Sequence, residues 1–487
     1  MDNTQNTNTG IRSGLFWKLM ERFGVQGIQF ILQILLARIL SPEHYGTLSM
    51  MIIFTTLANV FIQNGFNTAL IQNKDVTDED YSSVFWISLG IAVILYAMIF
   101  LASPVIAAFY GIPDIVMPLR ILALMLFPGA LNSIQVAKVS REMDFKKVFF
   151  SSVSGILLAG IAGVAVALLG GGLWALVVQN LLNITTACIV MLFTVRWHPK
   201  LVCDLCRVAV LFRFGWKLLA AALLDTLQQS LCSLVIGRKY DSDTLGYFNR
   251  GLQFPQFVMN AVIGAMQGVL LPAMAENQDD TQKVKELMRN SLLVSSYVIF
   301  PMMAGLAAVS APLIRLLLTE KWLSAVPYMQ INCFVFAFYS VHVCNLQAIN
   351  AVGRSDLFLK LEIVKKAYSL LLIVIAVACF DTPIAIAMTG LIGTVLGWYV
   401  NAIPNKKLIG YSVWAQVLDL IPLMTMALVM CGVVLLVGFV AERMMMPSIG
   451  ILLIQITAGV TIYLLLSILV KPYPYCMILN TLKSLRK

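Results

Sequence analysis

The chain has 487 residues, of which 60% are hydrophobic and only 12% are charged. Ordinary globular domains carry about 25% charged residues, so this composition excludes a soluble protein of several domains. The formal net charge is +10, but the basic residues lie in short segments between apolar stretches. That distribution is typical of membrane topology and argues against nucleic-acid binding. The composition therefore predicts an all-α polytopic membrane protein.

Fourteen apolar stretches follow one another, and each is long enough to form a helix that crosses a bilayer. A turn at Asp381 and Pro383 separates the eleventh stretch from the twelfth. A polar N-terminal tail, 1–11, precedes them, and a basic tail, 471–487, follows them. We expect spans at 13–38, 44–72, 81–109, 114–138, 147–169, 173–195, 207–238, 245–274, 287–315, 323–351, 358–380, 382–403, 413–440 and 447–470.

Lys and Arg are unequally divided between the two alternating sets of connecting segments. The set that includes both terminal segments holds twenty of them, and the other set holds six. Because cytoplasmic loops are enriched in Lys and Arg, this asymmetry predicts that both termini are cytoplasmic. Such a topology requires an even number of spans.

The two halves of the chain share short motifs in the same order. Trp17-Lys18 recurs as Trp216-Lys217, and Tyr45-Gly46 is echoed by Leu245-Gly246. Six spans separate the copies, so both have the same orientation, as in the parallel repeats of many transporters. We expect two six-helix lobes related by this parallel repeat, followed by two further helices. Their bounds are 12–200 for the N-lobe, 201–405 for the C-lobe and 406–470 for the helix pair.

The first two helices of each half carry polar side chains along one helical face, because the residues recur at helical spacing. A charge in mid-membrane costs about 2.5–3.5 kcal/mol on insertion scales, so these stripes must face protein or a water-filled cavity. The cations are Lys18, Arg22, Arg213, Lys217 and Arg250. The amides are Gln26, Gln29, Gln33, Asn59, Gln63, Asn67, Gln228, Asn249, Gln253, Gln256 and Asn260.

Two explanations of the stripes are open. Amides can bind helix to helix, at about 0.6 kcal/mol per hydrogen bond on average, or they can line a hydrophilic cavity between the lobes. Four or five polar residues in register on each of four helices exceed what packing needs, which favours the cavity. Amides suit a solute rich in hydroxyls, and Arg and Lys suit phosphate. Alternatively, Lys18 and Arg213 can reach the headgroups, and Arg22 can pair with Glu21.

Asp225 is the one acidic residue deep in an apolar span. Two roles fit it: pairing with Lys217, or binding a coupling proton or Na⁺. We expect no other cofactor.

The sequence offers no enzyme chemistry. It contains no phosphate-binding loop, zinc-protease motif or hydrolase motif. Its three histidines, His44, His198 and His342, are isolated along the chain. The single pair Cys203 and Cys206 has no second pair at zinc spacing, so we expect no metal site.

Three segments carry a resemblance to a known family. Leu36–Gly46, with the sequence LARILSPEHYG, is similar to the LAR-L-P-x-x-YG signature of the polysaccharide-transporter branch of the MOP superfamily. The segments FIQNGF at 61–66 and DTLGYFNR at 243–250 resemble the next helix and its second-half counterpart. The resemblance covers spans one to twelve and points to the Wzx-type exporters of lipopolysaccharide and exopolysaccharide biosynthesis.

This resemblance implies an alternating-access flippase in the bacterial cytoplasmic (inner) membrane. The implied substrate is an undecaprenyl-pyrophosphate-linked oligosaccharide repeat unit, destined for O-antigen, capsule or exopolysaccharide. Its sugar-pyrophosphate head group suits a wet, amide-rich, cationic cavity, while its polyprenyl tail stays among the membrane lipids. The polysaccharide polymerase machinery is an implied partner.

The alternative is a MATE-type cation-coupled exporter of drugs or small solutes. Cavities for cationic drugs are expected to be acidic and aromatic, whereas the first helices of both lobes are net basic here. A third class, a membrane protein that organises a polysaccharide synthase without transporting anything, would not need the stripes.

Overall fold

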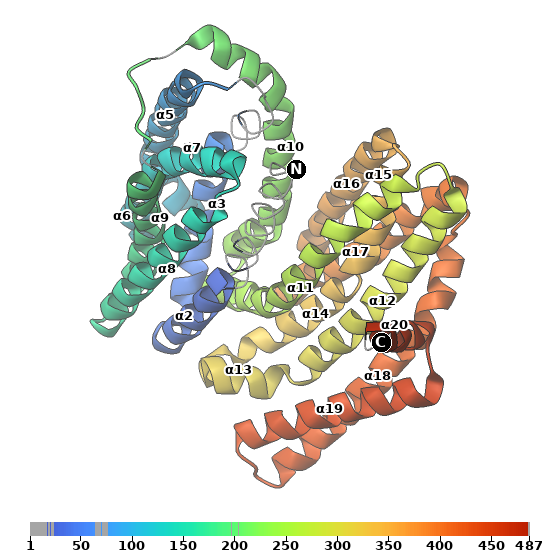
Figure 1. Ribbon diagram of the computed structural model, residues 1–487. Coiled ribbons are helices and arrows are strands. Elements are labelled where there is room, and N and C mark those ends of the chain that lie inside the picture. Colours follow the sequence, from blue (N-terminus) through green and yellow to red (C-terminus); the bar gives the residue numbers. More distant parts are fainter. Residues whose placement is uncertain are drawn as a thin grey trace. The chain divides into compact units, whose positions relative to one another are not determined.

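The computed structural model describes Trp17, Met20, residues 24–63, Leu70, and residues 76–485 apart from Arg196 and Cys203. These residues form helices and connecting turns, and no strand occurs among them. They divide into two compact units, Met1–Gly246 and Tyr247–Lys487 (Figure 1). The predicted all-α fold class is therefore confirmed.

The first unit contains a helical hairpin, α8 and α9, in which the two helices pack along their length. Gly155 of α8 permits this approach, because a Cβ there would lie 2.7 Å from the backbone oxygen of Asn183. The helices of this unit are α2 (Gln26–Ile39), α3 (Pro42–Gln63), α5 (Asp78–Tyr110), α6 (Val116–Leu122), α7 (Leu126–Glu142), α8 (Phe145–Leu168), α9 (Leu173–Val195) and α10 (Leu205–Lys239), with 3-10 turns η2 (Pro113–Ile115) and η3 (Ala123–Met125).

The second unit is organised around α12, which packs against α14, α15 and α18. The pair α18 and α19 lies along one edge of this unit in Figure 1. The helices are α11 (Ser242–Glu276), whose first residues belong to the first unit, α12 (Thr281–Ala308), α13 (Ser310–Leu318), α14 (Val326–Ala337), α15 (Tyr339–Ala351), α16 (Ser355–Cys379), α17 (Pro383–Ile409), α18 (Val413–Arg443), α19 (Ser448–Val470) and α20 (Tyr473–Leu485), with the 3-10 turn η4 (Glu320–Ala325).

The helix ends agree with some of the predicted spans and differ from others. The predicted turn near Asp381 separates α16 from α17, and α9 has the predicted bounds of the sixth span. The ninth span is divided into α12 and α13 at Val309, and the tenth into η4, α14 and α15. Part of the expected C-terminal tail forms a helix, α20, which was not predicted.

Eleven helices in the described part of the chain are long and apolar enough to cross a membrane. The spans predicted at 13–38, 245–274 and 358–380 correspond to α2, α11 and α16, which are not among these eleven. The protein is therefore a multi-pass membrane protein, while the count of fourteen, the lobe bounds and the parallel repeat stay predictions.

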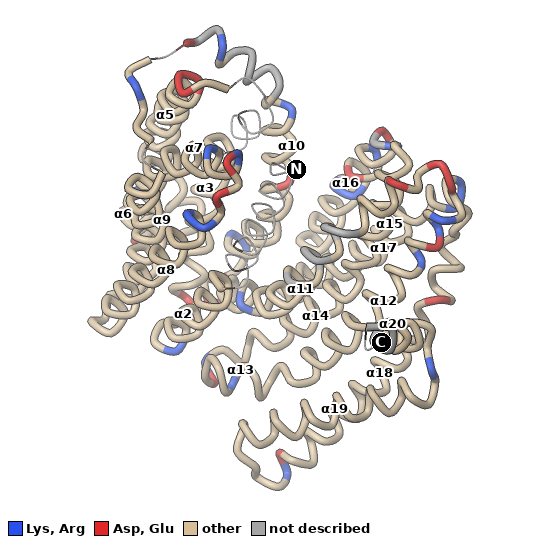
Figure 2. The backbone as a smooth tube through the Cα atoms, viewed as in Figure 1, with Lys and Arg blue, Asp and Glu red and all other residues tan. Residues whose placement is uncertain are grey.

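Local sequence signals set several helix boundaries. Thr77 and Asp80 form a capping box at the start of α5, in which each side chain accepts a hydrogen bond from the other residue's backbone N–H. Gly111, with φ of 71°, ends the same helix in the left-handed conformation that glycine adopts without strain. Figure 2 shows that charged residues concentrate near helix ends, with long uncharged runs between them.

Candidate functional site

The structure describes most, but not all, of the predicted stripe residues. Lys18, Arg22 and Asn67 lie outside the described residues, as does the side chain of Arg213. Of the others, Gln26, Gln33, Asn59, Gln228, Asn249, Gln253 and Asn260 are half-buried, Arg250 is buried, and Gln29, Gln63, Lys217, Asp225 and Gln256 are exposed. The role of these residues as a cavity lining stays a prediction.

Two stripe amides in the first unit have side-chain oxygens that accept no hydrogen bond from the described residues. The side-chain oxygens Gln33 Oε1 on α2 and Asn59 Oδ1 on α3 are buried and have no hydrogen-bond partner among the described residues. Asn59 lies opposite Gly129 of α7, where a Cβ would approach its oxygen to 3.2 Å. An amide oxygen accepts hydrogen bonds, so each of these two atoms retains the capacity to accept one.

Arg250 and Gln253 are predicted site residues that the structure brings into direct contact. Arg250 on α11 is only 5% exposed, and its Nη1 donates a hydrogen bond to Gln253 Oε1. Its guanidinium carbon lies 5.5 Å from the ring centroid of Trp322, a cation–π distance, and Trp322 itself is fully buried. An apolar environment strengthens such an interaction, so the protein holds a cation inside the second unit.

The tyrosine–glycine signature and its second-half echo meet in space. The start of α3 and the start of α11 touch by their backbones, both within the first unit. A Cβ on Gly46 would overlap the carbonyl oxygen of Ser242, and a Cβ on Gly246 would overlap that of Pro42. Both positions therefore require glycine for a close approach of two chain segments.

The acidic side chains at this contact act on one another. Asp243, in the first turn of α11, lies outside the apolar span predicted there. Burial raises the pKa of the Asp243 carboxyl, and the nearby carboxylates of Glu43 and Asp241 act in the same direction.

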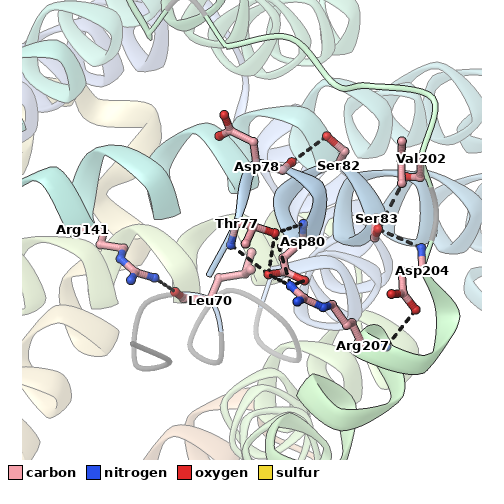
Figure 3. A network of polar contacts seen from close by, with 10 residues as sticks. All are labelled: Leu70, Thr77, Asp78, Asp80, Ser82, Ser83, Arg141, Val202, Asp204 and Arg207. Carbon is pink, nitrogen blue, oxygen red and sulfur yellow. Dashed lines mark hydrogen bonds and ion pairs between the residues drawn. The ribbon is translucent and has the colours of Figure 1, made fainter. Parts of the chain in front are cut away.

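The connection between α9 and α10 is fastened to the start of α5 by a polar network, drawn in Figure 3. Arg207 Nη1, on α10, donates hydrogen bonds to both carboxylate oxygens of Asp80, at 2.9 and 3.1 Å. Asp80 also accepts the backbone N–H of Thr77 at 2.8 Å. The Asp80 side chain is only 7% exposed, so this carboxylate is satisfied both by the capping box and by a cation from another helix.

Serine hydroxyls on α5 bind the same connection further along. Ser83 Oγ accepts the backbone N–H of Asp204 at 2.9 Å (Figure 3), and Ser82 Oγ accepts that of Lys200 at 3.1 Å. Trp197 packs edge-on against Tyr81 in the apolar cluster beneath. This connection joins the two predicted lobes. Its attachment to α5 fixes where α10 begins.

Asp80→Ala should lower the free energy of unfolding by about 2–3 kcal/mol, because it removes the Asp80 half of the capping box and the charge-assisted hydrogen bonds with Arg207 together. Thermal unfolding of the purified protein in detergent measures the change. The control is Asp78→Ala, which removes the exposed ion pair with Lys138 and should cost less than about 1 kcal/mol. Equal losses in the two variants would contradict a structural role for the network.

The second unit contains a buried amide cluster that the sequence did not suggest. Asn345 on α15 and Gln416 on α18 exchange two hydrogen bonds of 3.0 Å, and Asn405 on α17 donates to Asn345 Oδ1 at 2.8 Å. All three residues are fully buried. Trp398 Nε1 also donates to Gln416 Oε1 at 3.0 Å. Interhelical amide bonds of this kind hold three helices together.

One cavity in the second unit is apolar. It measures about 450 Å³ and lies among α11, α12, α13, α18 and α19, with residues such as Leu306, Val434, Leu452 and Ile456 in its wall. Its chemistry suits an apolar group and offers little to a sugar or phosphate.

The family model described as polysaccharide biosynthesis protein matches residues 35–327, which is more than half of the chain. The chain belongs to this family. The matched segment includes α3, α10 and α11, and so most of the predicted stripes and the contact of Gly46 with Ser242.

Curated relatives agree with the family, and a solved structure has a similar fold. The chain is 27% identical to the teichuronic acid biosynthesis protein TuaB of Bacillus subtilis, covering 71% of this chain and 72% of that protein. It is 25% identical to the lipopolysaccharide biosynthesis protein WzxC of Escherichia coli, covering 84% and 83%. Its fold resembles the inward closed conformation of the lipid II flippase MurJ, with a TM-score of 0.74 and 13% identity, covering 94% of this chain and 99% of that one.

Proposed function

We propose that this protein is a flippase that moves a lipid-linked oligosaccharide across the bacterial cytoplasmic membrane by alternating access. The observation that carries the proposal is membership of the polysaccharide biosynthesis family over residues 35–327. The fold shared with a lipid II flippase supports it, since that protein's name describes movement of a lipid-linked substrate. On this proposal the protein is a carrier and not an enzyme.

We further propose undecaprenyl-pyrophosphate as the lipid carrier of the substrate. The cations of the stripes suit its pyrophosphate, and the amides, including Gln33 Oε1 and Asn59 Oδ1 with their unused acceptors, suit the sugar hydroxyls. A proton or Na⁺ is the coupling ion on this proposal, and the polymerase machinery is the partner that receives the product.

Purified protein in liposomes should move an undecaprenyl-pyrophosphate-linked oligosaccharide from the outer to the inner leaflet. Protection of the oligosaccharide from a glycosidase added outside measures the movement, and protein-free liposomes give the spontaneous rate. A protein that fails to exceed that rate, yet expels a cationic dye under an ion gradient, would favour the MATE-type alternative.

Both termini lie in the cytoplasm on this proposal, because the alternating set of segments that includes both termini holds twenty Lys and Arg, against six in the other set. Reporter fusions at Lys147 and Lys200 should then be cytoplasmic, and fusions at Gly171 and Asp241 periplasmic. A reversed pair among these four sites would contradict the topology.

A further inference from the structure

His342 on α15 is isolated along the sequence but not in the fold. Its Nδ1 lies 3.2 Å from Asn401 Nδ2 on α17, and the ring also hydrogen-bonds to the backbone of Thr394. Gly397 makes the close approach possible, because a Cβ there would lie 2.9 Å from the ring carbon Cε1. The imidazole is therefore clamped against one face of α17.

Asn401 is fully buried, and its side-chain oxygen Oδ1 has no hydrogen-bond partner among the described residues. With Nδ2 facing the ring, the amide donates and the neutral imidazole accepts. A protonated imidazole carries hydrogen on both nitrogens and can only donate. If the Asn401 side-chain amide flips, its oxygen Oδ1 faces the protonated Nδ1 of His342 and accepts a hydrogen bond from it.

Burial of the ring is the main obstacle to its protonation, and a nearby positive charge adds to it. Lys365 on α16 is the charged group that acts on His342, and it opposes a second positive charge. Lys365 is itself neutralised by Glu362, whose Oε1 lies 2.5 Å from its Nζ. From the same helix, the Tyr368 hydroxyl donates to the Gly393 carbonyl at 3.0 Å. Arg289 on α12 and Asp419 on α18 are two other charged residues of the second unit. They pair with each other at 2.7 Å.

We propose that His342 is a proton-binding site within the second unit, and that Asn401 is its positioning residue, whose amide turns over when the proton arrives. The proton adds to Nδ1, the ring becomes a donor at that atom, and Asn401 Oδ1 becomes its acceptor. Ionisable residues inside membrane proteins mark ion and proton pathways. Here the ligand is a proton, and Asn401 is the hydrogen-bond partner of the residue that binds it. The site is distinct from the polar stripes and from Asp225, so it goes beyond the proposed function.

Histidine labelled with ¹⁵N, in the full chain in lipid nanodiscs, reports protonation of each ring nitrogen by NMR. The chain has three histidines, so the His342 signals are those lost in His342→Gln. As the pH falls, these signals should move from neutral to protonated positions. In Asn401→Leu, which offers no acceptor, the midpoint should lie about one pH unit lower or more, the equivalent of a hydrogen bond to a charged group.

Asn401→Asp tests the same point in the opposite direction and covers the case in which Asn401→Leu does not fold. A carboxylate at Nδ1 should raise the midpoint. Gln455→Leu is the matched control, because it removes another buried amide, bonded to Val434 on a different helix pair, and should leave the titration unchanged. The proposal is overturned if the ring stays neutral over the whole pH range in which the protein remains folded, or if both Asn401 variants titrate like the native protein. The measurement involves no transport, so its failure and that of the proposed flippase are distinguishable.

Discussion

Gly46→Ala should destabilise the protein and abolish export of surface polysaccharide. The added Cβ would overlap the backbone carbonyl oxygen of Ser242, which cannot move away as a flexible side chain can. Overpacking of this kind costs about 1–3 kcal/mol, and a backbone overlap places the variant at the upper end of that range or beyond. Thermal unfolding in detergent and surface polysaccharide in cells are the two measurements. Gly246→Ala should behave in the same way, because its Cβ would overlap the carbonyl oxygen of Pro42.

Gly90→Ala is the control for this result. Gly90 lies inside α5, and a Cβ there would meet nothing within 4 Å. Since alanine is the better helix former, this variant should be neutral or slightly more stable. If Gly46→Ala and Gly90→Ala proved alike in stability and export, the backbone contact between α3 and α11 would have no consequence.

The helices could be predicted because hydropathy and helix-ending residues are local signals. A run of apolar residues long enough to cross a bilayer gives α9 its bounds, and Asp381 with Pro383 separates α16 from α17. Breaks inside apolar runs were missed, as at Val309 between α12 and α13, because hydropathy does not change there. The tail helix α20 was missed since a short segment with several basic residues looks like a solvated end.

The polar contacts could be predicted only in part. The repeat made Gly46 and Gly246 equivalent, but only the fold places the starts of their helices in backbone contact. Arg207 and Asp80 are separated by 127 residues, and Asn401 and His342 by 59, so no spacing rule links them. Each of these four residues is a single residue in a long segment, whereas a stripe can be recognised because its polar residues repeat at the helical period.

The stripes also show what repetition does not determine. Lys217 and Asp225 lie on one helix at the spacing predicted, and both side chains are exposed. Arg250 is instead buried beside Gln253 and Trp322, so equal positions in a pattern carry different environments. Substituting the cations one at a time, and measuring export, identifies those that contact the substrate.

Arg22→Gln and Lys217→Gln should each abolish surface-polysaccharide export while the protein remains in the membrane at normal abundance. The sequence predicts that the two cations occupy corresponding faces of the first helices of the two predicted lobes, and we expect them to bind the pyrophosphate. Arg22→Lys should retain part of the activity, because it keeps the charge and loses only the planar donor fork. Export is measured as surface polysaccharide, and abundance by immunoblot of the membrane fraction.

The competing explanation is that these cations serve only to pair with neighbouring acids, Arg22 with Glu21 and Lys217 with Asp225. Removing one partner of a pair in a low-dielectric environment leaves an uncompensated charge, and removing both relieves it. In that case Arg22→Gln with Glu21→Gln, and Lys217→Gln with Asp225→Asn, should restore export. A pyrophosphate site predicts the opposite, because neutralising the acid does not return the cation that the substrate needs. Export that stays lost in both double variants, at normal abundance, would therefore support the site, and recovery would assign these cations to pairing alone.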